Sequence, residues 1–196
     1  MKKLTVLNRA TSQIKRKARI SGMLLLSAFA VAGFTACENE DDEPIVDTIN
    51  EQDRNFAIAV SQSFNGQIAL GQLASVKGQD DSVQEYATMI SEDHGEAMIE
   101  LTGIVDGKDV EISGEVLPEI QSEIDRLSEL SDEEFDMEFI NSQQEINDNL
   151  RSALANEVDN GENYLLKSFA SKVDDVIKKH NTEADLVEAE IKIEDI

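Results

Sequence analysis

The stretch IALGQLASVKGQDDSVQEYATMISEDH, residues 68–94, contains two segments with helical periodicity and a short polar link between them. Before the link, Leu70 and Ala74 lie four residues apart, and after it Val83 and Ala87 repeat the same spacing. Such spacing places apolar side chains on one face of a helix. The link, KGQDDS, contains a glycine and acidic residues that favour the start of a new helix. The stretch therefore predicts two helices joined by a tight turn.

Working outward, alternating spacings of four and three residues recur in four long segments, two of them beyond residue 130. The inward positions are Phe56, Val60, Ser63, Gln67, Leu70 and Ala74; Val83, Ala87, Ile90, His94, Ala97 and Leu101; Asp136, Ile140, Gln143, Asn147, Leu150 and Leu154; and Phe169, Val173, Val176, His180, Ala184, Val187 and Ile191. This alternation over several turns is typical of packed, nearly aligned helices.

The residues between the segments agree with this interpretation. Asp80 or Asp81 is a suitable N-cap for the second helix, and SDEE at 131–134 is typical of a capping box. A longer break, DGKDVEISGEVLPE, precedes a shorter helical stretch at about 117–130. We therefore predict an all-α fold: a ferritin-like four-helix bundle over residues 53–192, with a long middle connection that carries a short extra helix.

The first 36 residues have the layout of a bacterial export signal. A basic region up to Arg19 is followed by an apolar run of about 17 residues, which is at the lower limit for crossing a bilayer. The run ends in FTAC, which resembles a lipobox, so we expect cleavage before Cys37 and acylation of that cysteine. The alternative is an uncleaved N-terminal membrane anchor. Cys37 is the only cysteine, so it forms no disulfide within the chain.

The acidic, polar composition of residues 37–52 predicts a flexible tether after the lipid attachment site. Its acidic run directly after Cys37 resembles the export signal of surface lipoproteins, and the alternative is a plain charged linker. We expect an outer-membrane lipoprotein of the cell envelope, facing either the periplasm or the outside.

The charge of the chain is distributed unevenly. Residues 1–36 hold seven of the 17 basic residues and no acidic one, so the remainder carries all 41 acidic residues and a net charge near −31. Such a surface repels phosphate backbones, and we do not expect nucleic-acid binding. The expected partner is the membrane, through acylated Cys37, while the sequence indicates no particular protein partner.

Each long segment also places a polar residue among its inward positions. These residues are Gln67, His94, Gln143, Asn147 and His180. Buried polar groups cost free energy unless they are paired, so we expect them to meet in one or two layers of the core. The layers coincide only if the long connection brings the two helix pairs into register.

Carboxylates near the two histidines raise the possibility of a metal site. The candidate ligands are His94, His180, Asp93, Asp136 and Glu183. Glu183 lies three residues after His180, a spacing that lets two helical side chains share an ion. The Glu-x-x-His motif of ferritin-like metal sites is missing at both histidines, because Ser91 and Ile177 stand three positions before them.

From Asp53 to about Glu190 the chain resembles the domain of unknown function 4142 family of bacterial envelope proteins. The stretches that carry the resemblance are IALGQLASVKGQDDSVQEYATMISEDH, LSDEEFDMEFINSQ and LLKSFASKVDDVIKKHNTEADL. The resemblance implies a ferritin-like fold and candidate ligands, and no defined reaction. It implies Asp-His at Asp93–His94, Phe-Asp at Phe135–Asp136, and His at His180.

At three positions the chain departs from the family pattern: the family usually has Glu at Gln67, Tyr at Phe139 and His at Asn147. Gln and Asn retain hydrogen-bonding capacity but remove a charge and an imidazole. This pattern favours a structural polar layer, with a residual divalent-metal site as the alternative. We therefore expect a non-enzymatic lipoprotein without a cofactor, and a metal-binding or metal-sequestering protein as the second possibility.

Overall fold

The computed structural model describes residues 47–194, and within this range the chain is entirely helical and connecting segments. The helices are α1 (Glu51–Lys77), α2 (Asp81–Val105), α3 (Pro118–Glu129), α4 (Asp132–Asn160) and α5 (Tyr164–Glu194). The all-α prediction is thus confirmed, including the shorter helix in the middle connection. The predicted signal segment, Cys37 and most of the acidic tether lie outside the described residues.

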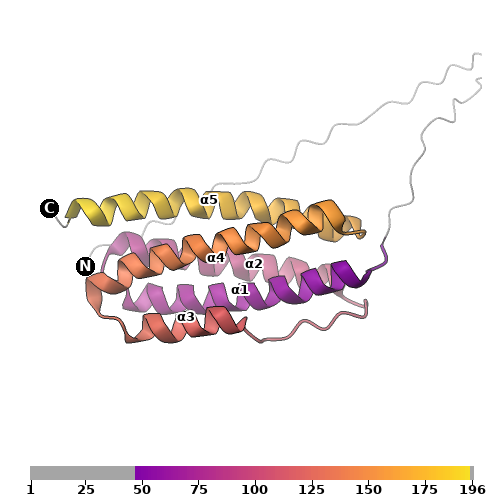
Figure 1. The fold of residues 1–196 in the computed structure, drawn as a ribbon, viewed down its shortest axis with the longest axis horizontal. Helices are drawn as coiled ribbons and strands as arrows, with labels where there is room; N and C mark the ends of the chain where they lie inside the picture. The colour runs from indigo at the N-terminus through magenta and orange to yellow at the C-terminus, as the bar shows by residue number, and fades with distance from the viewer. Residues whose placement is uncertain (1–46, 195–196) are drawn as a thin grey trace, which may run out of the picture. The chain divides into compact units, whose positions relative to one another are not determined.

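The four long helices, α1, α2, α4 and α5, lie side by side, and α3 packs on the outside against α1 and α4 (Figure 1). Helices α1 and α2 run antiparallel, as do α4 and α5, whereas α2 and α4 run in the same direction. The chain between α2 and α4 must therefore return along the length of the helices. The segment 106–117 and α3 make this return.

Side chains at the helix starts explain where the helices begin. Asn50 and Asp53 form a reciprocal capping box at the start of α1, and Asp80 caps α2 as the sequence predicts. The capping box predicted at Ser131 is wrong, because the Ser131 side chain makes no capping hydrogen bond. Ser131 is exposed, so water can satisfy the first N–H groups of α4.

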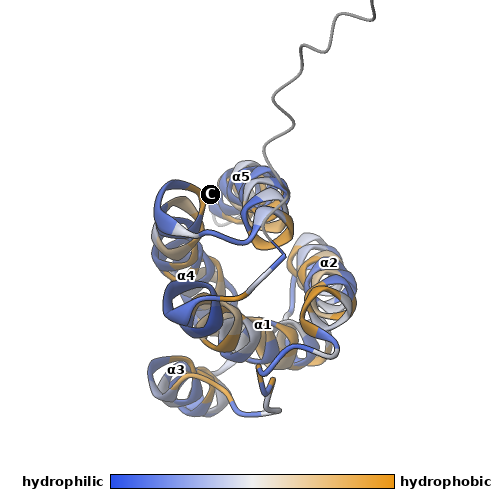
Figure 2. Ribbon diagram, turned by 90° about the vertical axis from the view of Figure 1, so that its right-hand side faces the viewer, coloured by the Kyte–Doolittle hydropathy of each residue, from blue (hydrophilic) through white to orange (hydrophobic). Residues whose placement is uncertain are grey.

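Viewed along the helices, hydrophobic residues turn toward the space enclosed by α1, α2, α4 and α5 (Figure 2). The buried hydrophobic residues extend from Phe56 to Ile191. The described residues 47–194 therefore contain their own hydrophobic core, which is the property of a domain that folds independently. In the described part of the chain, no helix is both long and apolar enough to cross a membrane.

Candidate functional site

A belt of buried polar side chains divides the core into two hydrophobic halves. We call it the polar belt; its members are Gln67, His94, Gln143, Asn147 and His180, none of them more than 1% exposed. One hydrophobic cluster contains Leu70, Ile90 and Phe139, and the other contains different residues of the same four long helices. Every long helix therefore contributes at least one buried side chain to the polar belt.

The belt forms because its members occupy inward helical positions at matching levels. On α1, Gln67 lies between Phe64 of one cluster and Leu70 of the other. On α5, His180 lies in the same way between Ile177 and Ala184. The long connection thus brings the two helix pairs into register, and the polar layers of the two pairs coincide.

Amide side chains connect three of the helices through the belt. Gln67 on α1 donates from Nε2 to Oδ1 of Asn147 on α4 at 3.0 Å, and Asn147 Nδ2 donates to Oδ1 of Asn181 on α5 at 2.7 Å. Burial raises the pKa of the nearby Tyr86 hydroxyl, which lies beside Asn147. Asn181 was not among the polar residues predicted to face the core. It could have been found from the sequence, because an amide residue, which is a poor helix former, lies there in the middle of a long helical segment.

The two histidines meet between α2 and α5. Nε2 of His180 lies 2.9 Å from Oδ2 of Asp93, and the rings of His94 and His180 are nearly perpendicular with centroids 5.2 Å apart. A carboxylate only accepts hydrogen bonds, so Asp93 fixes the proton of His180 on Nε2. The Nδ1 atom of His180 is then unprotonated, and its lone pair lies in the core.

Burial keeps both imidazoles neutral. Burial and, to a smaller extent, the proximity of His180 together lower the pKa of His94 to about 3. Burial also lowers the pKa of His180, although Asp93 opposes this effect. The His94 ring stacks on Phe64, with centroids 5.2 Å apart and an angle of 18° between the planes. Because this imidazole is neutral and packs on an aromatic ring, it can be buried next to a hydrophobic cluster.

Several atoms of the belt and of its neighbour Tyr86 are buried and have no hydrogen-bond partner within the protein. They are Oε1 of Gln67, Oη of Tyr86, Nε2 of His94, both amide atoms of Gln143 and Nδ1 of His180. Buried polar atoms are normally paired, so the belt has the capacity to bind water or another polar ligand. A cavity of about 110 Å³ between α2 and α5, lined by Asp93, His94 and Lys172, lies beside the histidines.

The structure brings together only some of the predicted metal ligands. Asp93, His94 and His180 are neighbours, whereas Asp136 accepts hydrogen bonds from the backbone N–H groups of Gln79 and Asp80 at 2.8–3.1 Å. Asp136 therefore lies at the end of the helices, roughly 20 Å along α2 from the histidines at 1.5 Å per residue. Its carboxylate holds the α1–α2 link to α4.

Glu183, the remaining candidate, is half-buried on α5 and makes no side-chain hydrogen bond or ion pair to the described residues. Across residues 47–194, no three His, Cys, Asp or Glu side chains are placed to hold one metal ion. A metal at the histidines would need the neutral amide oxygens of the belt, or water, as its further ligands.

A second pair of ionisable groups, which was not predicted from the sequence, lies buried at the end of the helices where α1 begins. Asp53 and Glu157 are both fully buried, with their carboxyl groups side by side. Asp53 accepts hydrogen bonds from the backbone N–H groups of Asn50, Glu162 and Asn163 at 2.9–3.1 Å. Burial opposes ionisation of Asp53, but these donors outweigh it and lower its pKa.

Glu157 has no comparable set of donors. Burial and the neighbouring Asp53 carboxylate raise the pKa of Glu157 to about 7, and its Oε1 has no partner. Gly161 allows this arrangement, because a Cβ atom there would lie 2.7 Å from the Glu157 carboxyl carbon. The pair therefore holds a proton near neutral pH where α1 meets the α4–α5 turn.

Comparison with known proteins places the sequence in one family. No curated protein and no solved structure matches the chain. Residues 40–187, most of the chain, match the family described as "Domain of unknown function (DUF4142)". The match covers the whole polar belt and both carboxyl groups of the buried pair. The chain therefore belongs to the DUF4142 family.

Proposed function

We propose that the protein is a lipoprotein of the bacterial cell envelope, anchored through acylated Cys37, and that its acidic helical domain acts as a non-enzymatic interaction module. We further propose that the domain is a ferritin-like four-helix bundle, which the four aligned long helices support. The matched region begins at residue 40, directly after the proposed lipid attachment site. The matched region thus includes most of the proposed acidic tether, residues 37–52, together with the helices up to residue 187.

The observation that carries the interaction role is the charge of the domain surface. Seven Lys and Arg side chains within residues 47–194 already pair with acidic side chains. The sequence after residue 36 contains only ten basic against 41 acidic residues, so most acidic groups retain no basic partner. Such a surface attracts cationic partners over a distance of about one Debye length, roughly 8 Å at physiological salt.

The anchor is tested by Cys37→Ala, with Ser27→Ala in the apolar run as the control. In cells given a radioactive fatty acid, the unchanged chain and Ser27→Ala should yield a labelled mature protein in the membrane fraction. Cys37→Ala should yield an unlabelled precursor. A Cys37→Ala protein that is processed to the same size and stays in the membrane would refute the lipoprotein proposal.

A second candidate function, metal binding, is favoured by the contact between Asp93 and His180. Histidine ligands commonly donate their second ring N–H to a carboxylate, which exposes the other nitrogen for coordination. Nε2 of His180 makes this contact, and both His180 Nδ1 and His94 Nε2 are buried without partners. These two nitrogens would bind a divalent ion such as Zn²⁺, with Gln67 Oε1 as a further donor.

Elemental analysis and titration with Co²⁺ test this second role. The purified segment from residue 38 should bind one equivalent, with visible absorption bands of nitrogen ligation. His94→Gln and His180→Gln should each remove these bands, and Glu183→Gln should not. Circular dichroism checks that the variants remain folded. The metal proposal fails if no stoichiometric metal binds or if both histidine variants retain it.

A further inference from the structure

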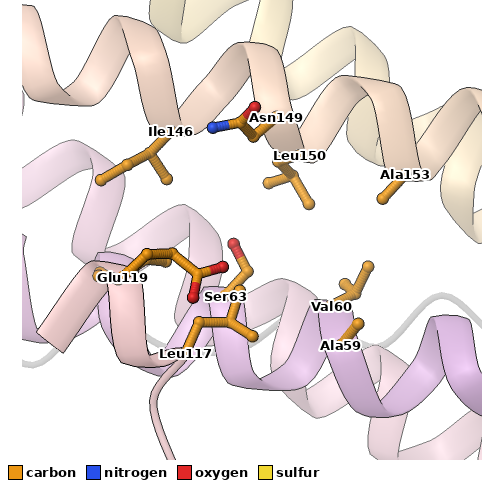
Figure 3. Close-up of a pocket in the computed structure, with 10 residues that line it drawn as sticks. Ala59, Val60, Ser63, Leu117, Glu119, Ile146, Asn149, Leu150 and Ala153 are labelled. Atoms are coloured by element: carbon orange, nitrogen blue, oxygen red, sulfur yellow. The ribbon is translucent and has the colours of Figure 1, made fainter.

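Helix α3 covers only part of the groove between α1 and α4. Where α3 begins, the groove holds a cavity of about 390 Å³ between these three helices (Figure 3). This volume lies within the range of pockets that bind small molecules, which is roughly 300–1,000 Å³. The cavity is separate from the polar belt and from the buried carboxyl pair.

The walls of the cavity are mainly apolar. Val60 on α1 and Ile146, Leu150 and Ala153 on α4 face one another across it, as Figure 3 shows. The small Ala153 side chain leaves space between the helices. An apolar ligand body of a few carbon atoms could therefore bury its surface here, and burial contributes about 0.8 kcal/mol per methylene group.

The polar side chains that line the cavity are Ser63, Asn149 and Glu119, and of these only Glu119 carries a charge. The side chains of Glu119 and Ser63 extend into the space between α1 and α4. A second hollow of about 120 Å³ continues along α3, shares Glu119 and adds Glu123 and Glu145. Glu123 is paired with Arg126, whereas Glu119 and Glu145 make no ion pair with the described residues. None of the described residues that line the two hollows is basic.

The position of Glu119 also determines the sign of a ligand charge. The first turn of α3 has no side-chain cap at Leu117, so its positive end would otherwise favour an anion. Glu119 already supplies a full negative charge in that turn. The strongly acidic chain adds to this potential and concentrates cations at its surface.

We propose that the α1–α3–α4 cavity binds a small amphipathic cation. The apolar part of the ligand packs against Val60, Leu150 and Ala153, and its ammonium group lies beside Glu119, with the Ser63 hydroxyl as an acceptor. This site is independent of the lipid anchor and of the histidines. The expected ligand is a protonated amine that carries a short hydrocarbon chain.

Calorimetric titration of the segment from residue 38 tests the proposal, with octylammonium, octanol and octanoate as matched probes. Octylammonium should bind saturably at one site, more tightly than octanol and more tightly still than octanoate. Ala153→Leu fills the cavity and should weaken binding at least about fivefold. Ala155→Leu, an exposed change on the same helix, should leave the affinity within about twofold.

The charge is tested by Glu119→Gln, which should weaken octylammonium binding about twofold to fivefold. Glu129→Gln at the far end of α3 should have no effect. Equal affinity for octanol would assign a neutral ligand, and tighter binding of octanoate an anionic one; either result overturns the proposal. The proposal is also overturned if no probe saturates, if Ala153→Leu binds like Ala155→Leu, or if sedimentation shows that a second copy of the chain fills the groove.

Discussion

Replacing Glu157 by Gln should change how the stability of the domain depends on pH. The pKa of Glu157 is raised from 4.5 to about 7 by burial and by the neighbouring Asp53 carboxylate. Between these two values the folded chain binds more protons than the unfolded chain. The stabilising contribution of Glu157 is therefore fully present below pH 4.5 and is lost as the pH rises through 7.

The size of this effect follows from the two pKa values. A difference between 4.5 and about 7 corresponds to up to about 3 kcal/mol, at 1.36 kcal/mol per pKa unit. Gln has nearly the same shape, stays neutral, and carries an amide N–H group that can donate to the neighbouring Asp53 carboxylate. Glu157→Gln should therefore match the unchanged chain near pH 4.5 and unfold with a free energy up to about 3 kcal/mol higher at pH 8.

Urea denaturation followed by circular dichroism at pH 4.5, 6 and 8 measures this difference. The neutral forms of His94 and His180 also affect the pH dependence, with the opposite sign, because burial lowers the pKa of both. Subtracting the two chains removes these shared contributions. Glu190→Gln, an exposed change on α5, is the control and should shift stability equally at all three values. A Glu157→Gln protein that is no more stable than the unchanged chain at pH 8 would refute the reasoning.

Three further predictions concern stability, each measured by urea or thermal denaturation. Gln67→Leu and Asn147→Leu should each lower the free energy of unfolding by about 1–3 kcal/mol, because each change leaves a buried amide without its partner. The double variant should lose less than the sum of the two single effects. A loss equal to that sum would contradict the prediction. Gly71→Ala should destabilise, since a Cβ atom there would lie 2.6 Å from the α2 backbone, whereas Gly95→Ala, with nothing within 4 Å, should stabilise by about 0.5–1 kcal/mol. Asp53→Asn should cost about 2 kcal/mol, because an amide has one acceptor oxygen for three N–H donors; an unchanged midpoint would rule out a structural role for the carboxylate.

Periodicity predicted the helices and the polar belt because both follow from spacing along one helix. The inward positions of Gln67 and His180 could be read without knowing which helices are neighbours. The pairing of Gln67 with Asn147, and of His180 with Asp93, could not be predicted in the same way. Those contacts depend on the register of the two helix pairs, which the connection between α2 and α4 determines.

Asp136 and Glu157 differ from the sequence-based expectations for two separate physical reasons. Asp136 lies at an inward position, but at the end of a helix, where unpaired backbone N–H groups compete for a carboxylate. Glu157 continues the inward spacing of Leu150 and Leu154, and this signal was available in the sequence. Its buried state requires Asp53 beside it, a contact across more than a hundred residues that the sequence pattern alone does not reveal.

The polar belt also restricts how the helices can slide. Moving one long helix by a single turn, about 5.4 Å, would bring its polar residue against the aromatic and aliphatic side chains of one hydrophobic half. Gln67 would lose Asn147, and His180 would lose Asp93, while both remained buried. Aliphatic side chains alone would tolerate such a slip at small cost, because one apolar layer resembles the next. The polar belt thus favours one alignment of the four long helices along their axes over the alignments that are shifted by a turn.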